Sequence, residues 1–108
     1  MRLLGDVTGK HVILLDDMVD TGGTLCKAAE IIMDQGAASV RAMVTHPLLS
    51  GNAREILEKS ALIELIVTDT IPIIGEIPKI KVLSTADLFA EVIRRLKRRE
   101  SISSLFKF

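Results

Sequence analysis

The sequence predicts an α/β fold: a doubly wound parallel sheet of about four to five strands with three helices. Short apolar runs alternate along the chain with segments whose apolar residues recur at helical spacing. This alternation is typical of parallel strands joined by right-handed helical crossovers. The composition agrees, because 48% of the residues are hydrophobic and the only aromatic residues are three Phe. Such an aliphatic core suits a buried parallel sheet covered by helices.

Four short apolar runs are predicted to be strands, and they cover residues 11–15, 40–45, 62–67 and 80–83. The first run is continuous, which indicates a buried strand at the centre of the sheet. Pro47 ends the second strand. The two prolines and the glycine within residues 71–78 predict a loop before the fourth strand.

Three segments are predicted to be helices. Apolar residues at helical spacing run through residues 22–35, and Gly36 follows as a C-terminal stop. A second helix begins after Ser50 or Asn52, either of which can cap it. A third begins where Ser84 and Asp87 form a capping box. Its apolar positions are expected to be buried, and they are Leu88, Phe89, Val92, Ile93 and Leu96.

Length and charge limit the function classes. A chain of 108 residues makes one domain or a piece of one. Lys and Arg balance Asp and Glu at 14 each, so no global field attracts nucleic acid or an anionic membrane. A single cysteine excludes an internal disulfide and fits a reducing cytoplasm. No signal peptide or membrane-spanning run is visible. We therefore expect a cytoplasmic chain with no nucleic-acid or membrane partner.

Three acids surround a Gly/Thr loop at the start of the first helix. Asp16 and Asp17 end the first predicted strand, and Asp20 precedes the sequence Thr21-Gly22-Gly23-Thr24. Ligands of doubly wound sheets bind beyond the carboxyl ends of the strands. Glycines allow a ligand to approach the backbone closely, and free N–H groups at a helix start form a phosphate cradle. The loop lacks the lysine of P-loop NTPases.

The acids predict a ligand that carries hydroxyl groups as well as phosphate. A carboxylate repels phosphate but accepts hydrogen bonds from hydroxyls, so a phosphorylated sugar fits both features. We expect its hydroxyls at Asp16 and Asp17 and its phosphate at residues 20–24, where Thr21 and Thr24 add hydroxyl donors. The acids could also hold Mg²⁺, directly or through water. Asp20 is expected to orient the loop by accepting its N–H groups. The alternative is an N-cap cluster without a ligand, which this combination of acids disfavours.

The stretch "VILLDDMVDTGGTL" resembles the phosphoribosyl-diphosphate motif of type I phosphoribosyltransferases and ribose-phosphate pyrophosphokinases. Three further segments, "THPLLSGNAREIL", "VTDTIPI" and "ESISSLF", follow in the order that resembles the C-terminal domain of ribose-phosphate pyrophosphokinase. The resemblance covers nearly all 108 residues. It implies a phosphoribosyltransferase-like fold, with residues 1–108 as a single ribose-5-phosphate-binding domain.

The resemblance also implies an activity. The family transfers the β,γ-diphosphoryl group of Mg-ATP to ribose 5-phosphate, which yields phosphoribosyl diphosphate and AMP for nucleotide biosynthesis. The matching loop, Asp20 to Thr24, binds ribose 5-phosphate. The family's ATP-binding and catalytic residues, with most ligands of its Mg²⁺ cofactor, belong to a preceding domain that is absent from this sequence. We therefore expect no catalytic residue here, an inactive isolated chain, and a homo-oligomer for the full-length enzyme.

Two alternatives remain for the function. A phosphoribosyltransferase would share the acid-glycine loop, but its acceptor-base pocket and pyrophosphate loop are not found. A non-catalytic regulatory homologue would assemble with active subunits. Erosion of the acid-glycine loop would favour that homologue, and the loop is intact.

Weaker signals lie outside the loop. By resemblance, Ser101, Ser103 and Phe106 help form an allosteric site for phosphate or ADP at a subunit interface. Composition alone predicts a frayed end there. His46 is expected to be a structural loop histidine rather than a catalytic one, and Cys26 a packed thiol rather than a reactive one. Ser50 can contact a ligand or cap the second helix, and the two possibilities are equally supported.

Overall fold

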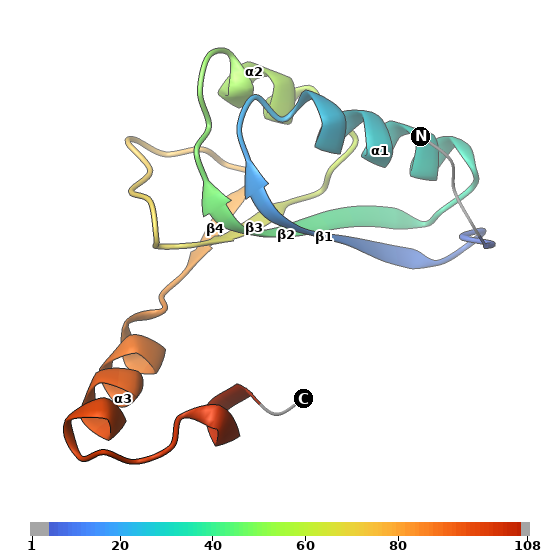
Figure 1. The fold of residues 1–108 in the computed structure, drawn as a ribbon. Helices are drawn as coiled ribbons and strands as arrows, with labels where there is room; N and C mark the ends of the chain where they lie inside the picture. The colour runs from blue at the N-terminus through green and yellow to red at the C-terminus, as the bar shows by residue number, and fades with distance from the viewer. Residues whose placement is uncertain (1–4, 107–108) are drawn as a thin grey trace.

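The computed structural model describes residues 5–106 and shows a four-stranded parallel sheet of order β1-β2-β3-β4 (Figure 1). The strands are β1 (His11–Val19), β2 (Ser39–Pro47), β3 (Leu65–Thr68) and β4 (Ile80–Leu83). The helices are α1 (Gly23–Asp34), α2 (Ala53–Glu58) and α3 (Ala86–Lys97), followed by a 3-10 turn, η1 (Ser103–Phe106). The expected α/β class, with four parallel strands and three helices, is confirmed. Within residues 5–106, no helix is both long and apolar enough to cross a membrane.

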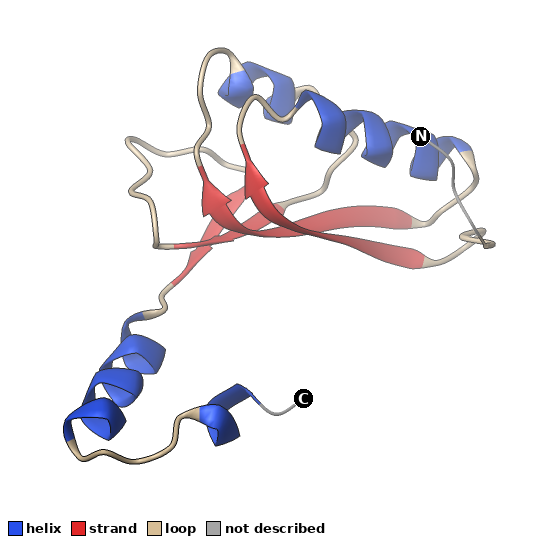
Figure 2. Cartoon of the chain, viewed as in Figure 1, coloured by secondary structure: helices blue, strands red, loops and turns tan. Residues whose placement is uncertain are grey.

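The core lies between the sheet and the two helices α1 and α2, which cover the same face (Figures 1 and 2). Strand β2 contributes alternate residues to this core, as expected for a strand whose side chains point to opposite faces in turn. Full burial of a side chain such as Leu57 contributes about 1.5–3 kcal/mol. The central members of the core are Ala29, Ile32, Val40, Ala42, Val44, Leu57, Leu65 and Val67.

The second face of the sheet carries exposed apolar side chains. Leu15 is 77% exposed and Ile13 is 55% exposed, whereas Val12 and Leu14 of the same strand pack against the core. The winding on both faces that the sequence predicted is therefore not seen within residues 5–106, and β1 is an edge strand rather than a central one. A continuous apolar run is typical of a strand that is buried on both faces of its sheet. Within residues 5–106, only one face of the sheet is covered by helices.

Backbone hydrogen bonds explain where β1 and α1 end. Strand β1 continues past its predicted end at Leu15, because its pairing with β2 persists to Val19 opposite Pro47. The predicted stop of α1 is confirmed. Gly36 has a φ of 93° and donates its N–H to Met33, while Ala37 donates to Ile32. This pair of bonds is the Schellman arrangement, in which a left-handed glycine satisfies the last carbonyls of a helix.

Helix α3 projects away from the sheet (Figure 1), and none of its residues is buried. The predicted burial of Leu88, Phe89, Val92, Ile93 and Leu96 is therefore wrong for this chain, and Ile93 is 64% exposed. Apolar residues at helical spacing indicate that one face of the helix is apolar, but they do not indicate which surface packs against that face. The predicted capping box is also absent, because Thr85 is the N-cap residue and makes no side-chain cap bond.

Asp69, just after β3, holds the start of α3. Its carboxylate accepts the N–H of Thr85 at 2.9 Å, the Thr85 hydroxyl at 2.5 Å and the Ser84 hydroxyl at 3.0 Å. These bonds lower the pKa of Asp69, and the Thr85 hydroxyl is the largest cause. The carboxylate therefore links the end of β3 to the start of α3.

This link predicts a pH dependence for the first turn of α3. Because the folded pKa of Asp69 lies below its unfolded value, the tether is present above the ordinary pKa and is lost as pH falls through the lowered one. The Thr85 amide resonance should follow this titration in NMR spectra. Asp69→Ala should shift that resonance at neutral pH, whereas Asp34→Ala, at an exposed acid of α1, should not. Titration of the Thr85 amide at the ordinary aspartate pKa would contradict the tether.

Candidate phosphosugar-binding site

The loop between β1 and α1 surrounds a hollow of about 290 Å³ at the carboxyl edge of the sheet. Strand β1 ends at Val19, the chain turns at Gly22, and α1 begins at Gly23. The residues that line the hollow are Asp16, Met18, Val19, Asp20, Thr21, Gly22, Gly23, Thr24 and Leu25. Six of the seven residues predicted to bind the sugar phosphate therefore lie together, and the seventh, Asp17, is not among the lining residues.

The two glycines of the loop have different roles. Gly22 is buried and has a φ of 84°, in the left-handed region that other residues rarely adopt. Gly23 has no such φ, and a Cβ built on it would lie no closer than 3.9 Å to another heavy atom, Thr21 Oγ1. The backbone therefore needs glycine at Gly22. At Gly23, the absence of a side chain instead leaves the space above the helix start open.

The start of α1 offers backbone donors to an anion. A helix leaves its first N–H groups without intrahelical partners, and here no side chain caps them. The first turn of α1 also contains no acidic residue, so its positive dipole end is not neutralised locally. These donors face the glycine turn. The arrangement can therefore bind a phosphate-like oxyanion.

Only one of the adjacent acids Asp16 and Asp17 lines the hollow. Both acids are exposed near the end of β1, and the one that lines the hollow is Asp16. The Asp16 carboxylate accepts the N–H of Asp17 at 2.8 Å and is exposed at the hollow. The structure thus brings Asp16, rather than both acids, next to the Gly/Thr loop.

Asp20 contacts a residue from another loop. Its carboxylate accepts a hydrogen bond from the hydroxyl of Ser50, which lies between β2 and α2. Within residues 5–106 no backbone N–H of the loop donates to Asp20, so the expected orientation of the loop through such bonds is not observed. Ser50 is also not the helix cap, because Asn52 holds that position in α2.

His46 has a hydrogen-bond partner outside the hollow, and Cys26 is partly buried. His46 Nδ1 lies 2.8 Å from the Thr70 hydroxyl, and neither residue lines the hollow. Burial raises the pKa of the Cys26 thiol, which agrees with a packed thiol rather than a reactive one. No group of three or more His, Cys, Asp or Glu side chains able to hold a metal ion occurs among residues 5–106.

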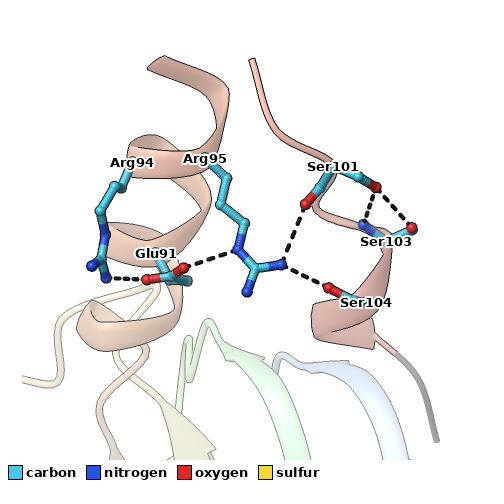
Figure 3. Close-up of polar contacts among 6 residues, drawn as sticks. All are labelled: Glu91, Arg94, Arg95, Ser101, Ser103 and Ser104. Atoms are coloured by element: carbon cyan, nitrogen blue, oxygen red, sulfur yellow. Dashed lines mark hydrogen bonds and ion pairs between the residues drawn. The ribbon is translucent and has the colours of Figure 1, made fainter. Parts of the chain in front are cut away.

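The C-terminal segment folds back along α3 and is held by Arg95 (Figure 3). The Arg95 guanidinium donates to the Ser104 hydroxyl at 2.7 Å, to the Ser101 carbonyl at 3.3 Å and to Glu91 at 2.9 Å. The Ser101 and Ser103 hydroxyls lie 2.9 Å apart and bond each other. Residues 101–106 therefore form a hydrogen-bonded turn beside α3, where composition alone predicted a frayed end. An allosteric role for Ser101, Ser103 and Phe106 stays a prediction.

Sequence reasoning missed two long-range contacts, from Ser50 to Asp20 and from Ser84 and Thr85 to Asp69. The rule that parallel strands gather their carboxyl ends at one edge could have indicated Asp69, because it follows β3 as Asp16 follows the apolar part of β1. No local pattern indicates the partner of either carboxylate, because 30 residues separate Ser50 from Asp20.

Comparison with known proteins identifies the family. Residues 1–107 match the phosphoribosyl synthetase-associated domain. The chain belongs to this family. It is 59% identical over 106 residues to the ribose-phosphate pyrophosphokinase of Helicobacter hepaticus and 54% identical to that of Campylobacter jejuni. Each alignment covers 98% of this chain and 34% of the relative.

A solved structure supports the same assignment. Phosphoribosylpyrophosphate synthetase from Mycobacterium smegmatis superimposes with a TM-score of 0.87 and 42% identity, over 91% of this chain and 34% of that one. The fold expected from the resemblance is confirmed. The chain thus spans about a third of the length of the relatives it matches. The expected C-terminal position within such a longer chain stays a prediction, because coverage gives the share that matches and not its place.

The two glycines should respond differently to alanine. Gly22→Ala forces a side chain into the left-handed region and should destabilise the fold by about 1–2 kcal/mol. Gly23→Ala should leave stability unchanged or raise it by about 0.5–1 kcal/mol, since glycine costs entropy inside a helix. Urea unfolding of both variants measures the difference. Equal destabilisation would show that Gly23, too, is required by the backbone.

Proposed function

We propose that this chain is the ribose-5-phosphate-binding domain of a ribose-phosphate pyrophosphokinase. The observation that carries the proposal is the hollow where Asp16 and the Gly/Thr loop meet the start of α1. Here a carboxylate can accept hydrogen bonds from sugar hydroxyls, and backbone N–H groups can donate hydrogen bonds to a phosphate. A phosphorylated sugar requires both. Identity of 59% to a ribose-phosphate pyrophosphokinase supports the same ligand.

The geometry suggests how ribose 5-phosphate lies in the hollow. Its phosphate takes the backbone donors of residues 21–24 and the hydroxyls of Thr21 and Thr24. Its ring hydroxyls then point toward the strand end, where Asp16 is exposed. Asp17 does not line the hollow, and its predicted contact with the sugar is part of the proposal.

The longer enzyme would transfer the diphosphoryl group of ATP to the 1-hydroxyl of the bound sugar. Such a transfer depends mainly on positioning and on neutralisation of phosphate charge. This domain would supply the positioning of the sugar phosphate. We assign ATP binding, the catalytic residues and homo-oligomer formation to the whole enzyme. The matched relatives are about three times as long as this chain. A cytoplasmic location stays a prediction from the sequence.

Mg²⁺ fits this site only together with its ligand. Magnesium usually keeps several waters and binds one or two carboxylates plus substrate phosphates. Asp16 offers one exposed carboxylate beside the phosphate loop, and residues 5–106 provide no cluster of three acidic, His or Cys ligands. We therefore assign Asp16 as a water-mediated or single ligand. Bound there, Mg²⁺ would neutralise phosphate charge.

The isolated chain should make no phosphoribosyl diphosphate from Mg-ATP and ribose 5-phosphate. The reason is that the proposed site holds sugar phosphate, while the nucleotide-binding residues are assigned to the rest of the enzyme. A coupled assay that detects AMP measures this, with a full-length relative as the positive control. Turnover well above the blank would place catalytic residues within these 108 residues.

Replacing Asp16 and Asp17 together by Asn should weaken ribose 5-phosphate binding about tenfold or more, which is the usual effect of losing a charged hydrogen bond. Binding of inorganic phosphate should be unchanged or slightly stronger, because negative charge near the cradle is removed. Calorimetry with both ligands measures the two effects on this chain. Asp34→Asn, far from the hollow, is the matched control. Equal losses for both ligands would mean that the acids shape the loop instead of contacting the sugar.

A further inference from the structure

We propose that Ser50 is a positioning residue that keeps the phosphate loop open by holding Asp20 away from it. The inference rests on the proposed function, because it concerns the same anion site. According to this proposal, the loop between β2 and α2 supports the anion site in addition to the loop between β1 and α1. Ser50 itself contacts Asp20 and is not required to contact the ligand.

The two connections form one structural unit. Leu48 and Leu49 donate their N–H groups to the carbonyl of Val19, at 2.9 and 3.3 Å, so the segment after β2 runs beside the end of β1. Leu49 has a φ of 51°, in the left-handed region, and the chain turns there immediately before Ser50. The hydroxyl of Ser50 then donates to the carboxylate of Asp20.

Helix α2 supports the same loop from the other side. A Cβ built on Gly22 would lie 3.8 Å from Leu57 and 3.9 Å from Ile56, so the glycine turn rests on α2. Leu57 is 1% exposed and anchors α2 in the core. The position of Ser50, two residues before the helix cap, is therefore determined by the packing of α2.

A free Asp20 would compete with phosphate. Aspartate side chains readily bond to backbone N–H groups two or three residues further along the chain, and they are favoured caps of helix starts. Those positions after Asp20 are Gly22 and Gly23, at the start of α1 where no side-chain cap bond is formed. Ser50 supplies a different donor to the carboxylate. The backbone donors of the loop consequently stay available to an oxyanion.

This role predicts non-additive effects on binding. Ser50→Ala should free Asp20 to cap α1 and weaken inorganic phosphate binding about three- to tenfold, the range for one hydrogen bond. In the background Asp20→Ala, the same serine substitution should change phosphate affinity less than about twofold, because the competing carboxylate is gone. Ser50→Thr keeps the hydroxyl and should bind as the unmodified chain does.

The experiment is calorimetry of the 108-residue chain with inorganic phosphate and with ribose 5-phosphate. It compares the unmodified chain with Ser50→Ala, Ser50→Thr, Asp20→Ala and the double variant that combines Ser50→Ala with Asp20→Ala. Ser84→Ala is the matched control, because it removes a serine hydroxyl from a similar contact with Asp69, away from the hollow. Amide resonances of Gly22 and Gly23 provide a second readout. They should shift in Ser50→Ala without ligand, as Asp20 approaches them, and not in the double variant.

Each outcome decides between the two proposals. Unchanged phosphate affinity in Ser50→Ala would overturn the role of Ser50 while leaving the proposed function in place. An equal loss with and without Asp20 would also overturn it, since Ser50 would then act on the ligand directly. If the unmodified chain bound neither phosphate nor ribose 5-phosphate, the proposed function would fail and this inference with it.

Discussion

The parallel pairing of β1 with β2 is the constraint on which the candidate site depends. The register runs from His11 opposite Ser39 to Val19 opposite Pro47, so both strands reach the same edge of the sheet together. The loop after each strand therefore emerges beside the other, and the crossover through α1 returns the helix start to this edge. A one-residue slip would move Asp16 to the opposite face. Neither loop could form the hollow without this register.

Two acids, Asp16 and Asp20, line the anion site, and they are tolerable there because both are exposed and both have other hydrogen-bond partners. In water, two unit charges 4 Å apart interact by only about 1 kcal/mol, and salt reduces this further. Asp16 accepts the N–H of Asp17, and Asp20 accepts the hydroxyl of Ser50. The backbone donors of the loop can therefore act on phosphate while the acids remain close enough to select a ligand that carries hydroxyls.

The sequence predicted what local patterns determine. The Gly/Thr loop, the stop at Gly36 and the bounds of β4 depend on a few adjacent residues, and all three are present in the structure. Burial of α3 was predicted wrongly, because apolar spacing describes a face and not its partner. The sequence treated Asp16 and Asp17 alike, and no local signal indicates that only Asp16 lines the hollow. The contact of Ser50 with Asp20 depends on tertiary packing and has no local signal.

The site and the C-terminal unit are structurally independent in this chain. The hollow is built by β1 and α1 and supported by β2 and α2. Asp69, after β3, bonds the start of α3, and Arg95 joins α3 to η1. None of the residues in α3 or η1 is buried, so the core and the loop geometry do not depend on them. The contacts that hold the phosphate loop lie within residues 11–58, so its geometry follows from β1, β2, α1 and α2.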